Sequence, residues 1–558
     1  MHAIGLLLGC KVDFGKPAIV LTERMTLAHC GFDALFNIPF GLARNMTSII
    51  EVPSVNSRRR AHRIRMSLTY ILKRTGISGF QHSEQSMLEA EKKELSMTTT
   101  SESVFRDVFQ KPTADDYIEE ARKAAVYINT KKIRTPNGLV WSLDDAKTYL
   151  TDYYDEICMY AGSTGIAHFY VQLYQATQEE SYLDDAKEAA RYIIWRWDNQ
   201  RDLAKCFNKY AFTTGYGGVA ILLDELYSLT GNDEYRRVIC EIAESAIKDA
   251  IPSDNGKGYH WSTYPGIVGD ASVILLLLKL GKDYNHPEWS EFAIRAGRSY
   301  LDKGQPYAQG GRYYLGVDPK YFGAGDDYID PNFPMGTCGI GFLLLRLYEE
   351  SDDKAFLDAV DGIHDFVKAV ALENDSKTAA LLPHGLPNRP DTYYLGFCHG
   401  PAGSARFYHE LYKVTGDEEA KIWEEKLLNG IIETGAPEIH SNGYWDILCL
   451  CCGTAGMVNA FLGKWASSGK QRYYDWAERS ARVLLGRGQR FRTEKGEIAT
   501  KWNQAFAYVA QDQVTANIGM YDGAAGIGWV LLQFGLAAGG RFHAARTLDD
   551  PYPAHKLD

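Results

Sequence analysis

Apolar and polar positions along the chain define two kinds of segment with helical spacing. One kind is apolar on nearly every side, as in residues 219–227 and 340–348. The other carries charges on one face, as in residues 182–194 and 417–426. Both spacings predict α-helices, and the alternation typical of β-strands is scarce. A helix that is apolar all round must be covered by other helices, so the first kind is predicted to lie inside and the second outside.

A Gly-x-x-Gly motif occurs seven times, and apolar helices are predicted directly after it. Successive first glycines lie 51 to 70 residues apart; they are Gly162, Gly215, Gly266, Gly336, Gly400, Gly453 and Gly523. Glycine at the start of an inner helix lets the backbone approach its surroundings closely. A row of inner and outer helices buries every inner helix only when it closes on itself, because an open row leaves an apolar face at its end. The sequence therefore predicts an all-α fold, an α/α toroid (barrel) of seven helical hairpins.

The first part of the chain lacks this pattern. Residues 1–96 contain a cluster of basic residues at 58–65, and we predict a basic N-terminal extension there, whose structure the pattern does not indicate. The run Met97-Thr-Thr-Thr-Ser-Glu102 is typical of a natural chain start. The extension is therefore either a genuine appendage or the product of a start codon assigned too far upstream. The toroid is predicted over residues 97–558.

Composition narrows the functional classes. Of the 558 residues, 45% are hydrophobic and 23% charged, which is typical of a globular protein. The net charge is −11 and no basic face stands out in the main body, so we expect no nucleic-acid partner. No apolar run reaches the roughly 18–20 residues of a membrane helix, and the N-terminus lacks a secretory signal, so we expect a cytoplasmic protein without an integral membrane segment. Its ten cysteines are then core residues or metal ligands rather than disulfides.

Three cysteines stand just before the first glycines of two neighbouring motifs. Cys398 belongs to Cys398-His399-Gly400, and Cys451 and Cys452 precede Gly453 directly. Equivalent positions of adjacent hairpins face the same cavity, so these thiols can meet although more than 50 residues separate them. Buried cysteines are often simply small apolar core residues. The matching register favours a zinc site instead, in which three protein ligands leave one position open for water or substrate.

These motifs resemble those of the lanthionine synthetase cyclase (LanC-like) family. Cys398-His399-Gly400-Pro-Ala-Gly403 matches the family's Cys-His-Gly-x-x-Gly, and Cys451-Cys452-Gly453 stands where a subset of cyclases has Cys-Cys-Gly. The resemblance covers roughly residues 114–540. It implies an α/α barrel that holds zinc and adds a thiol to dehydroalanine or dehydrobutyrine. Zinc lowers the pKa of a bound thiol, and three cysteine ligands leave the site with a charge of −1, which favours an electron-rich, nucleophilic sulfur.

The chain departs from the family where its acid and base residues are expected. Met335 stands in place of a histidine before Gly336, and the stretch from His260 to Gly266 lacks the expected aspartate. The candidate proton carriers are therefore His399, His260 and Asp522, with His384 a weaker candidate. Each also has a structural interpretation: His399 as a packed histidine, His260 as a rim residue and Asp522 as a helix cap.

The expected partners are a peptide or small-molecule thiol, such as glutathione, and an unsaturated acceptor. No phosphate-binding loop is present and the chain has no room for a kinase or lyase domain, so we expect a separate dehydratase to produce the acceptor. Two alternatives stay open. The missing aspartate and histidine favour a catalytically degenerate zinc-binding scaffold. A carbohydrate-active α/α barrel enzyme would instead need paired carboxylates or histidines and would leave the cysteines unused.

Overall fold

A computed structural model describes residues 111–143, 154–203, 206, 208–254, 256–316, 328–439, 444–445, 447–505 and 514–557. The predicted basic extension, residues 1–96, lies outside the described residues. Lys111–Asp558 belong to one unit. Within the described part, no helix combines the length and the apolar character needed to cross a membrane.

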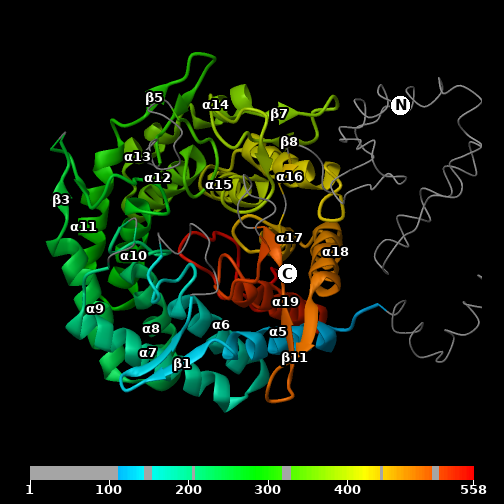
Figure 1. The fold of residues 1–558 in the computed structure, drawn as a ribbon. Helices are drawn as coiled ribbons and strands as arrows, with labels where there is room; N and C mark the ends of the chain where they lie inside the picture. Colours follow the sequence, from blue (N-terminus) through cyan, green and yellow to red (C-terminus); the bar gives the residue numbers. More distant parts are fainter. Residues whose placement is uncertain are drawn as a thin grey trace, which may run out of the picture. The chain divides into compact units, whose positions relative to one another are not determined.

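The described residues of this unit form two layers of helices (Figure 1). The seven inner helices are almost wholly buried along their first halves, and they are α6 (Ser163–Thr177), α8 (Tyr216–Thr230), α10 (Asp270–Asp283), α12 (Thr337–Ser351), α15 (Pro401–Thr415), α17 (Thr454–Ser468) and α19 (Ala524–Ala538). The outer helices bury one face only, and they are α5 (Ala114–Asn129), α7 (Glu180–Asn199), α9 (Asp233–Lys248), α11 (Pro287–Gly297), α13 (Lys354–Val360), α14 (Ile363–Val370), α16 (Glu418–Glu433) and α18 (Gln471–Arg487). The predicted inner and outer layers are thus confirmed.

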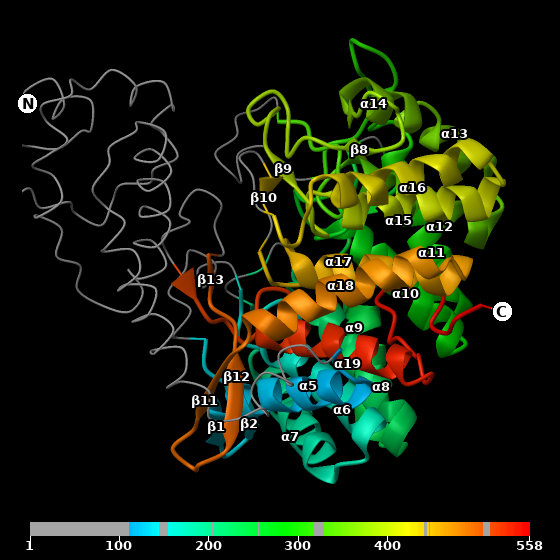
Figure 2. The same cartoon turned by 90° about the vertical axis from the view of Figure 1, so that its right-hand side faces the viewer.

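The inner helices form a closed ring. Each packs against the next along the chain, and α19 packs against both α17 and α6. Six outer partners follow their inner helix directly, from α7 on α6 to α18 on α17. The seventh pair joins the two ends of the ring: α5, in blue, lies beside α19, in red, in Figures 1 and 2. This closure buries the apolar face that an open row would leave exposed.

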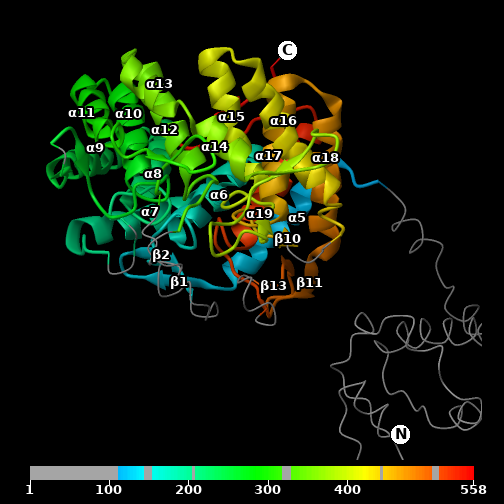
Figure 3. The same cartoon turned by 90° about the horizontal axis from the view of Figure 1, so that it is seen from above.

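Short two-stranded sheets connect outer helices to the next inner helix. The antiparallel pairs are β1 (Lys132–Thr135) with β2 (Gly138–Trp141), β3 (Ile251–Pro252) with β4 (Tyr259–His260), β5 (Gln305–Pro306) with β6 (Arg312–Tyr313), β7 (Leu372–Glu373) with β8 (Ala380–Leu381), β11 (Gln489–Arg492) with β12 (Ile498–Lys501), and β13 (Gln504–Ala505) with β14 (Val514–Thr515). The parallel pair β9 (Tyr393–Tyr394) and β10 (Tyr444–Trp445) links two repeats. The labelled strands β1, β2, β10, β11 and β13 lie at one end of the ring in Figure 3. The inner helices begin at this end, which we call the mouth.

The loop before each inner helix explains the repeated glycines. In six repeats the first glycine is the N-cap of the inner helix, and its backbone is extended. A Cβ atom on any of these six would lie within 2.4 Å of the carbonyl oxygen six residues earlier. At the second glycine the crowding is as severe: a Cβ on Gly526 would lie 1.8 Å from the Met520 carbonyl oxygen. The predicted close approach is confirmed, and at these glycines it is to the loop of the same repeat.

The third repeat departs from the predicted register. Helix α10 begins after Gly269, the second glycine of its motif, so Ser272 takes the position that a glycine holds elsewhere. The cause is the loop, where Asp270 accepts hydrogen bonds from the backbone of Trp261 and Ser262 and from the Ser262 hydroxyl. The side-chain amide of Asn208 donates a fourth. These bonds hold the Asp270 carboxylate against the loop and fix the start of the helix one turn later.

The crowding predicts opposite effects for two glycine substitutions. Gly526→Ala forces the new methyl against a backbone carbonyl that cannot move freely, so we expect a loss of about 1–3 kcal/mol in the free energy of unfolding. Gly486→Ala is the matched control, because a Cβ there meets nothing within 4 Å and lies inside α18. Alanine's higher helix propensity should leave that variant unchanged or more stable by up to about 1 kcal/mol. Urea unfolding of both variants measures the difference; equal effects would contradict the steric explanation.

Candidate metal centre

A belt of backbone hydrogen bonds ties neighbouring loops together at the mouth. Cys398 donates to the Cys451 carbonyl at 3.0 Å, and Cys451 donates to that of Tyr521 at 2.9 Å. Tyr521 and Tyr160 continue the series at 2.8 Å each, and it ends at the Thr213 carbonyl. All of these residues stand two positions before an N-cap glycine. The belt therefore sets equivalent positions of successive repeats side by side.

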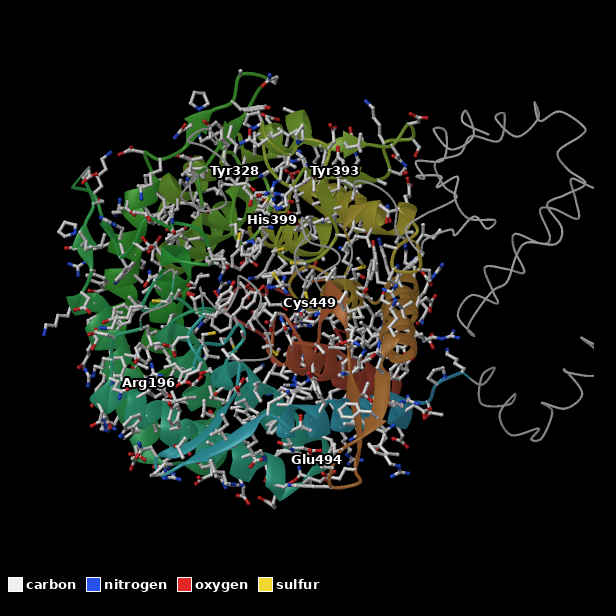
Figure 4. The ribbon with its side chains drawn as sticks, in the orientation of Figure 1. Arg196, Tyr328, Tyr393, His399, Cys449 and Glu494 are labelled. Atoms are coloured by element: carbon white, nitrogen blue, oxygen red, sulfur yellow. The ribbon has the colours of Figure 1, made fainter. Side chains whose placement is uncertain are left out.

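The belt brings the three predicted cysteines together. The sulfurs of Cys398, Cys451 and Cys452 all lie within 4.8 Å of one another, and those of Cys398 and Cys452 are 3.3 Å apart. All three side chains are buried. No other group of three potential ligand residues that could hold a metal ion is found among the described residues. Cys449 and His399 mark the position of the cluster toward the middle of the ring in Figure 4.

The sulfur spacing fits a tetrahedral ion. Zinc–sulfur bonds of about 2.3 Å place the sulfurs of a tetrahedron about 3.8 Å apart. The 3.3 Å separation of the Cys398 and Cys452 sulfurs is shorter than that value and every sulfur pair lies within 4.8 Å, so small side-chain adjustments would complete three corners. The same three residues offer only thiols, which is the donor set that selects zinc over magnesium or calcium.

The three thiols do not ionise alike. Hydrogen bonds from the Cys398 and Cys452 thiols lower the pKa of Cys451 well below its usual value. Burial raises the pKa of Cys398, and the hydrogen bond with Cys398 raises that of Cys452. The pKa of Cys451 is thus lowered while those of Cys398 and Cys452 are raised, and a cation held by all three sulfurs would favour their ionised forms.

A small cavity lies at the centre of the mouth, beside the cysteines. It measures about 20 Å³, enough for about one water molecule. Its lining includes the residue two positions before the N-cap glycine in every repeat: Tyr160, Thr213, Ile267, Pro334, Cys398, Cys451 and Tyr521. Tyr160 stacks on Tyr154 with ring centroids 4.3 Å apart and on Tyr521 at 5.3 Å. Three stacked tyrosine rings thus line the cavity next to the cysteines.

His399 faces a carboxylate that the sequence did not indicate. Its Nε2 lies 3.2 Å from Asp330 Oδ2, and both side chains are buried. Asp330 is oriented by the backbone and side chain of Asn332. The ring of His384 stacks on His399 at 4.0 Å, and burial lowers the pKa of His384 well below its usual value. The His399 ring therefore lies between the Asp330 carboxyl group and the ring of His384.

The other two predicted proton carriers lie in different surroundings. Asp522 is buried in the loop before α19, and burial raises its pKa to about 7. Asn517 donates to its Oδ2 at 3.0 Å. His260 is half-buried on β4, where its Nδ1 lies 3.3 Å from the Ser262 carbonyl oxygen. His260 does not contribute to the lining of the described cavity.

Two acidic residues at the site were missed by sequence reasoning. Asp330 begins Asp330-Pro-Asn332, a turn signal in the loop before Gly336 that could have pointed to it. Asp549 lines the cavity although it lies beyond the last repeat. No motif surrounds Asp549, so only its position in the folded chain identifies it.

Comparison with known proteins gives one family and one shared fold. Residues 154–536 match the family described as lanthionine synthetase C-like protein. Among solved structures, nisin cyclase is similar with a TM-score of 0.53 and 13% identity, over 75% of this chain and 93% of that one. D-mannose isomerase (TM-score 0.39, 15% identity, 57% and 86%) and an unsaturated glucuronyl hydrolase specific for heparin (0.39, 11%, 76% and 98%) are also similar. No curated protein shows significant sequence similarity.

The raised pKa of Asp522 predicts a pH-dependent stability. In the unfolded chain its pKa returns to about 3.9, so ionising it in the fold costs stability that grows between about pH 4 and pH 7. A difference of about three pKa units corresponds to about 4 kcal/mol. Asp522→Asn cannot ionise, so it avoids this cost. We therefore expect the difference in free energy of unfolding between the variant and the parent to change by about 2–3 kcal/mol in the variant's favour from pH 5 to pH 8. Urea unfolding at both pH values checks this; a constant difference would show that Asp522 does not titrate in this range.

Proposed function

Since this chain belongs to the lanthionine synthetase C-like family, we propose that it adds a thiol to a dehydroamino acid or a similar unsaturated acceptor, with zinc as its cofactor. The thiol is a peptide cysteine or a small thiol such as glutathione. In this proposal a separate dehydratase prepares the acceptor, and the reaction takes place in the cytoplasm. The single observation that supports it best is the cluster of three buried thiols, two of which, those of Cys398 and Cys451, belong to residues that line the small cavity.

We propose Cys398, Cys451 and Cys452 as the zinc ligands. Zinc held there would lower the pKa of a substrate thiol at its fourth position and so make a thiolate available near neutral pH. The cysteines keep the net charge of the site negative, which keeps sulfur nucleophilic. The aromatic side chains of Tyr154, Tyr160 and Phe397 line the cavity and exclude water from the reacting atoms.

The proposed proton carriers are His399, Asp522 and His260. His399 is the best placed of the three, because it adjoins Cys398 and its Nε2 faces the Asp330 carboxyl group at 3.2 Å. Asp522 lies buried close enough for Cys451 to raise its pKa. His260 would have to act from outside the cavity lining. We therefore rank His399 before Asp522 and His260.

The cavity argues against glycoside hydrolysis. That chemistry uses two carboxyl groups that flank the scissile bond. Among the described residues that line the cavity, Asp549 alone carries a carboxyl group. A catalytically degenerate zinc-binding scaffold is the remaining alternative, and it predicts metal binding without thiol consumption.

Metal content tests the ligand assignment. We expect about one zinc per chain, and a large loss of zinc in Cys398→Ala and Cys451→Ala, because two thiolates hold the ion far less tightly than three. Cys338→Ala is the matched control, since Cys338 is a buried cysteine of α12 outside the cluster. Elemental analysis gives the stoichiometry, and circular dichroism should show that the helices persist. A Cys451/Cys452 double variant that still held one zinc would refute the assignment.

Thiol consumption tests the reaction itself. The parent protein should consume glutathione in the presence of a peptide that contains one dehydroalanine, and zinc loss should abolish turnover. Zinc-loaded His399→Asn should be slower by about 10²–10⁴-fold, as expected for the loss of an acid or base, and His260→Asn should change the rate less. A zinc-loaded parent that consumes no thiol would favour the scaffold interpretation, and equal rates in the parent and His399→Asn would move proton transfer to another group.

A further inference from the structure

The C-terminal segment, residues 541–557, packs into the ring from the end opposite the mouth. Tyr552 is buried, and its hydroxyl donates to Glu424 of α16 at 3.1 Å. The backbone N–H of Leu557 donates to the Ala466 carbonyl of α17 at 2.8 Å. The marked C-terminus lies beside α17 and α19 in Figure 1 and away from β10 and β13 in Figure 3. The segment therefore lies at the end of the ring opposite the mouth and approaches the cavity from that end.

Asp549 reaches the cavity from this segment. Its side chain is 1% exposed, and it lines the same cavity as Cys398 and Cys451. The Thr547 hydroxyl donates to its Oδ1 at 2.5 Å. Its Oδ2 has no hydrogen-bond partner within the described part of the chain. A buried carboxyl oxygen without a partner is unfavourable and points to a missing ligand or proton.

The neighbouring residue Asp550 shows the contrast. Its Oδ2 accepts from Arg546 at 2.9 Å, and its Oδ1 accepts from the backbone N–H of Tyr552 at 3.1 Å. It does not line the cavity. Both of its oxygens are thus occupied by the segment itself. Two adjacent carboxyl groups therefore differ: Asp550 is bonded within the segment, whereas Asp549 lines the cavity and its Oδ2 has no hydrogen-bond partner in the described part of the chain.

Burial and the charged groups around Asp549 act on its pKa in opposite directions. Burial raises its pKa, while the guanidinium of Arg406, 3.5 Å away on α15, opposes that rise. Asp550 from its own segment adds to the rise, and Tyr521 from the loop before α19 also faces it. Arg406 lies over the ring of Phe397, next to Cys398, at 4.6 Å. Buried Arg406 thus contacts both Asp549 of the C-terminal segment and Phe397 of the loop that carries Cys398.

We propose that Asp549 is the proton donor of the thiol addition; this inference rests on the proposed function. The thiolate sulfur forms a bond to the β-carbon of the acceptor, and the π electrons of the double bond move to the α-carbon. The α-carbon takes the proton of the Asp549 carboxyl group. The proton that the incoming thiol releases restores Asp549, so one thiol and one acceptor are consumed without another reactant. Because the C-terminal segment holds the Asp549 carboxyl group in a fixed position, the proton is delivered to one face of the α-carbon only.

The stereochemistry of the product separates this role from a structural one. Parent, Asp549→Asn and the control Asp550→Asn are incubated with glutathione and a peptide that contains one dehydroalanine, and the configuration at the new α-carbon is determined. The parent and Asp550→Asn should give one epimer. Zinc-replete Asp549→Asn should be slower by about 10²–10⁴-fold and give both epimers, because solvent then protonates the α-carbon. A parent-like rate and a single epimer in Asp549→Asn, or mixed epimers in Asp550→Asn as well, would overturn the inference.

A second variant keeps the test decisive if Asp549→Asn does not fold. Thr547→Ala retains the carboxyl group but removes the hydrogen bond that stabilises its ionised form, so the pKa of Asp549 should rise. Activity that requires the protonated donor should then extend to higher pH. An unchanged alkaline limb of kcat would exclude Asp549 as the donor. A parent that consumes no thiol would instead refute the proposed function, so the two failures are distinguishable.

Discussion

The hydrogen bond at the start of the inner helices is the interaction on which the arrangement of the mouth depends. In five of the repeats, the first helical N–H donates to the carbonyl oxygen six residues before the N-cap glycine, at 2.6 to 2.9 Å. The bond satisfies a helix end that would otherwise lack a partner in the buried ring. In these five repeats it also holds the loop in the same shape. The belt of inter-loop hydrogen bonds follows from that identity, because equal loops present equal donors and acceptors to their neighbours.

The chemistry of the site follows from which side chains occupy these equivalent positions. Most positions around the cavity carry aromatic or aliphatic residues, and two adjacent ones carry Cys398 and Cys451. The shared loop shape then brings their thiols, and that of Cys452, within a few ångströms although they are distant in sequence. Crowding of three thiols in an apolar setting disfavours their joint ionisation. A bound cation would resolve that conflict, which supports the zinc site proposed above.

Two pairs of ionisable side chains are buried near the cysteines. Asp330 and His399 lie on the loops of neighbouring repeats beside the cysteines. Asp549 and Arg406 lie below the cavity, where the C-terminal segment meets α15. Each pair places a carboxyl group beside a side chain that can carry a positive charge, which reduces the cost of burying the carboxyl group. Of these four residues Asp549 alone lines the cavity, whose remaining lining is largely apolar.

Local patterns in the sequence determined the architecture and indicated the three cysteines that lie together, and the tertiary structure decided the rest of the site. Apolar spacing identifies α8 and α12 as inner helices, and the register of Cys398 with Cys451 identifies a shared position, because periodicity and backbone sterics are properties of short segments. The one-turn delay of α10 was not predictable, since it depends on Asp270 bonding to Asn208 of an earlier repeat. Pairing of α5 with α19, the approach of Asp330 to His399 and the entry of Asp549 into the cavity likewise join distant parts of the chain. Such contacts join residues far apart in the sequence. They depend on the path of the whole folded backbone, so the pattern of a short segment cannot predict them.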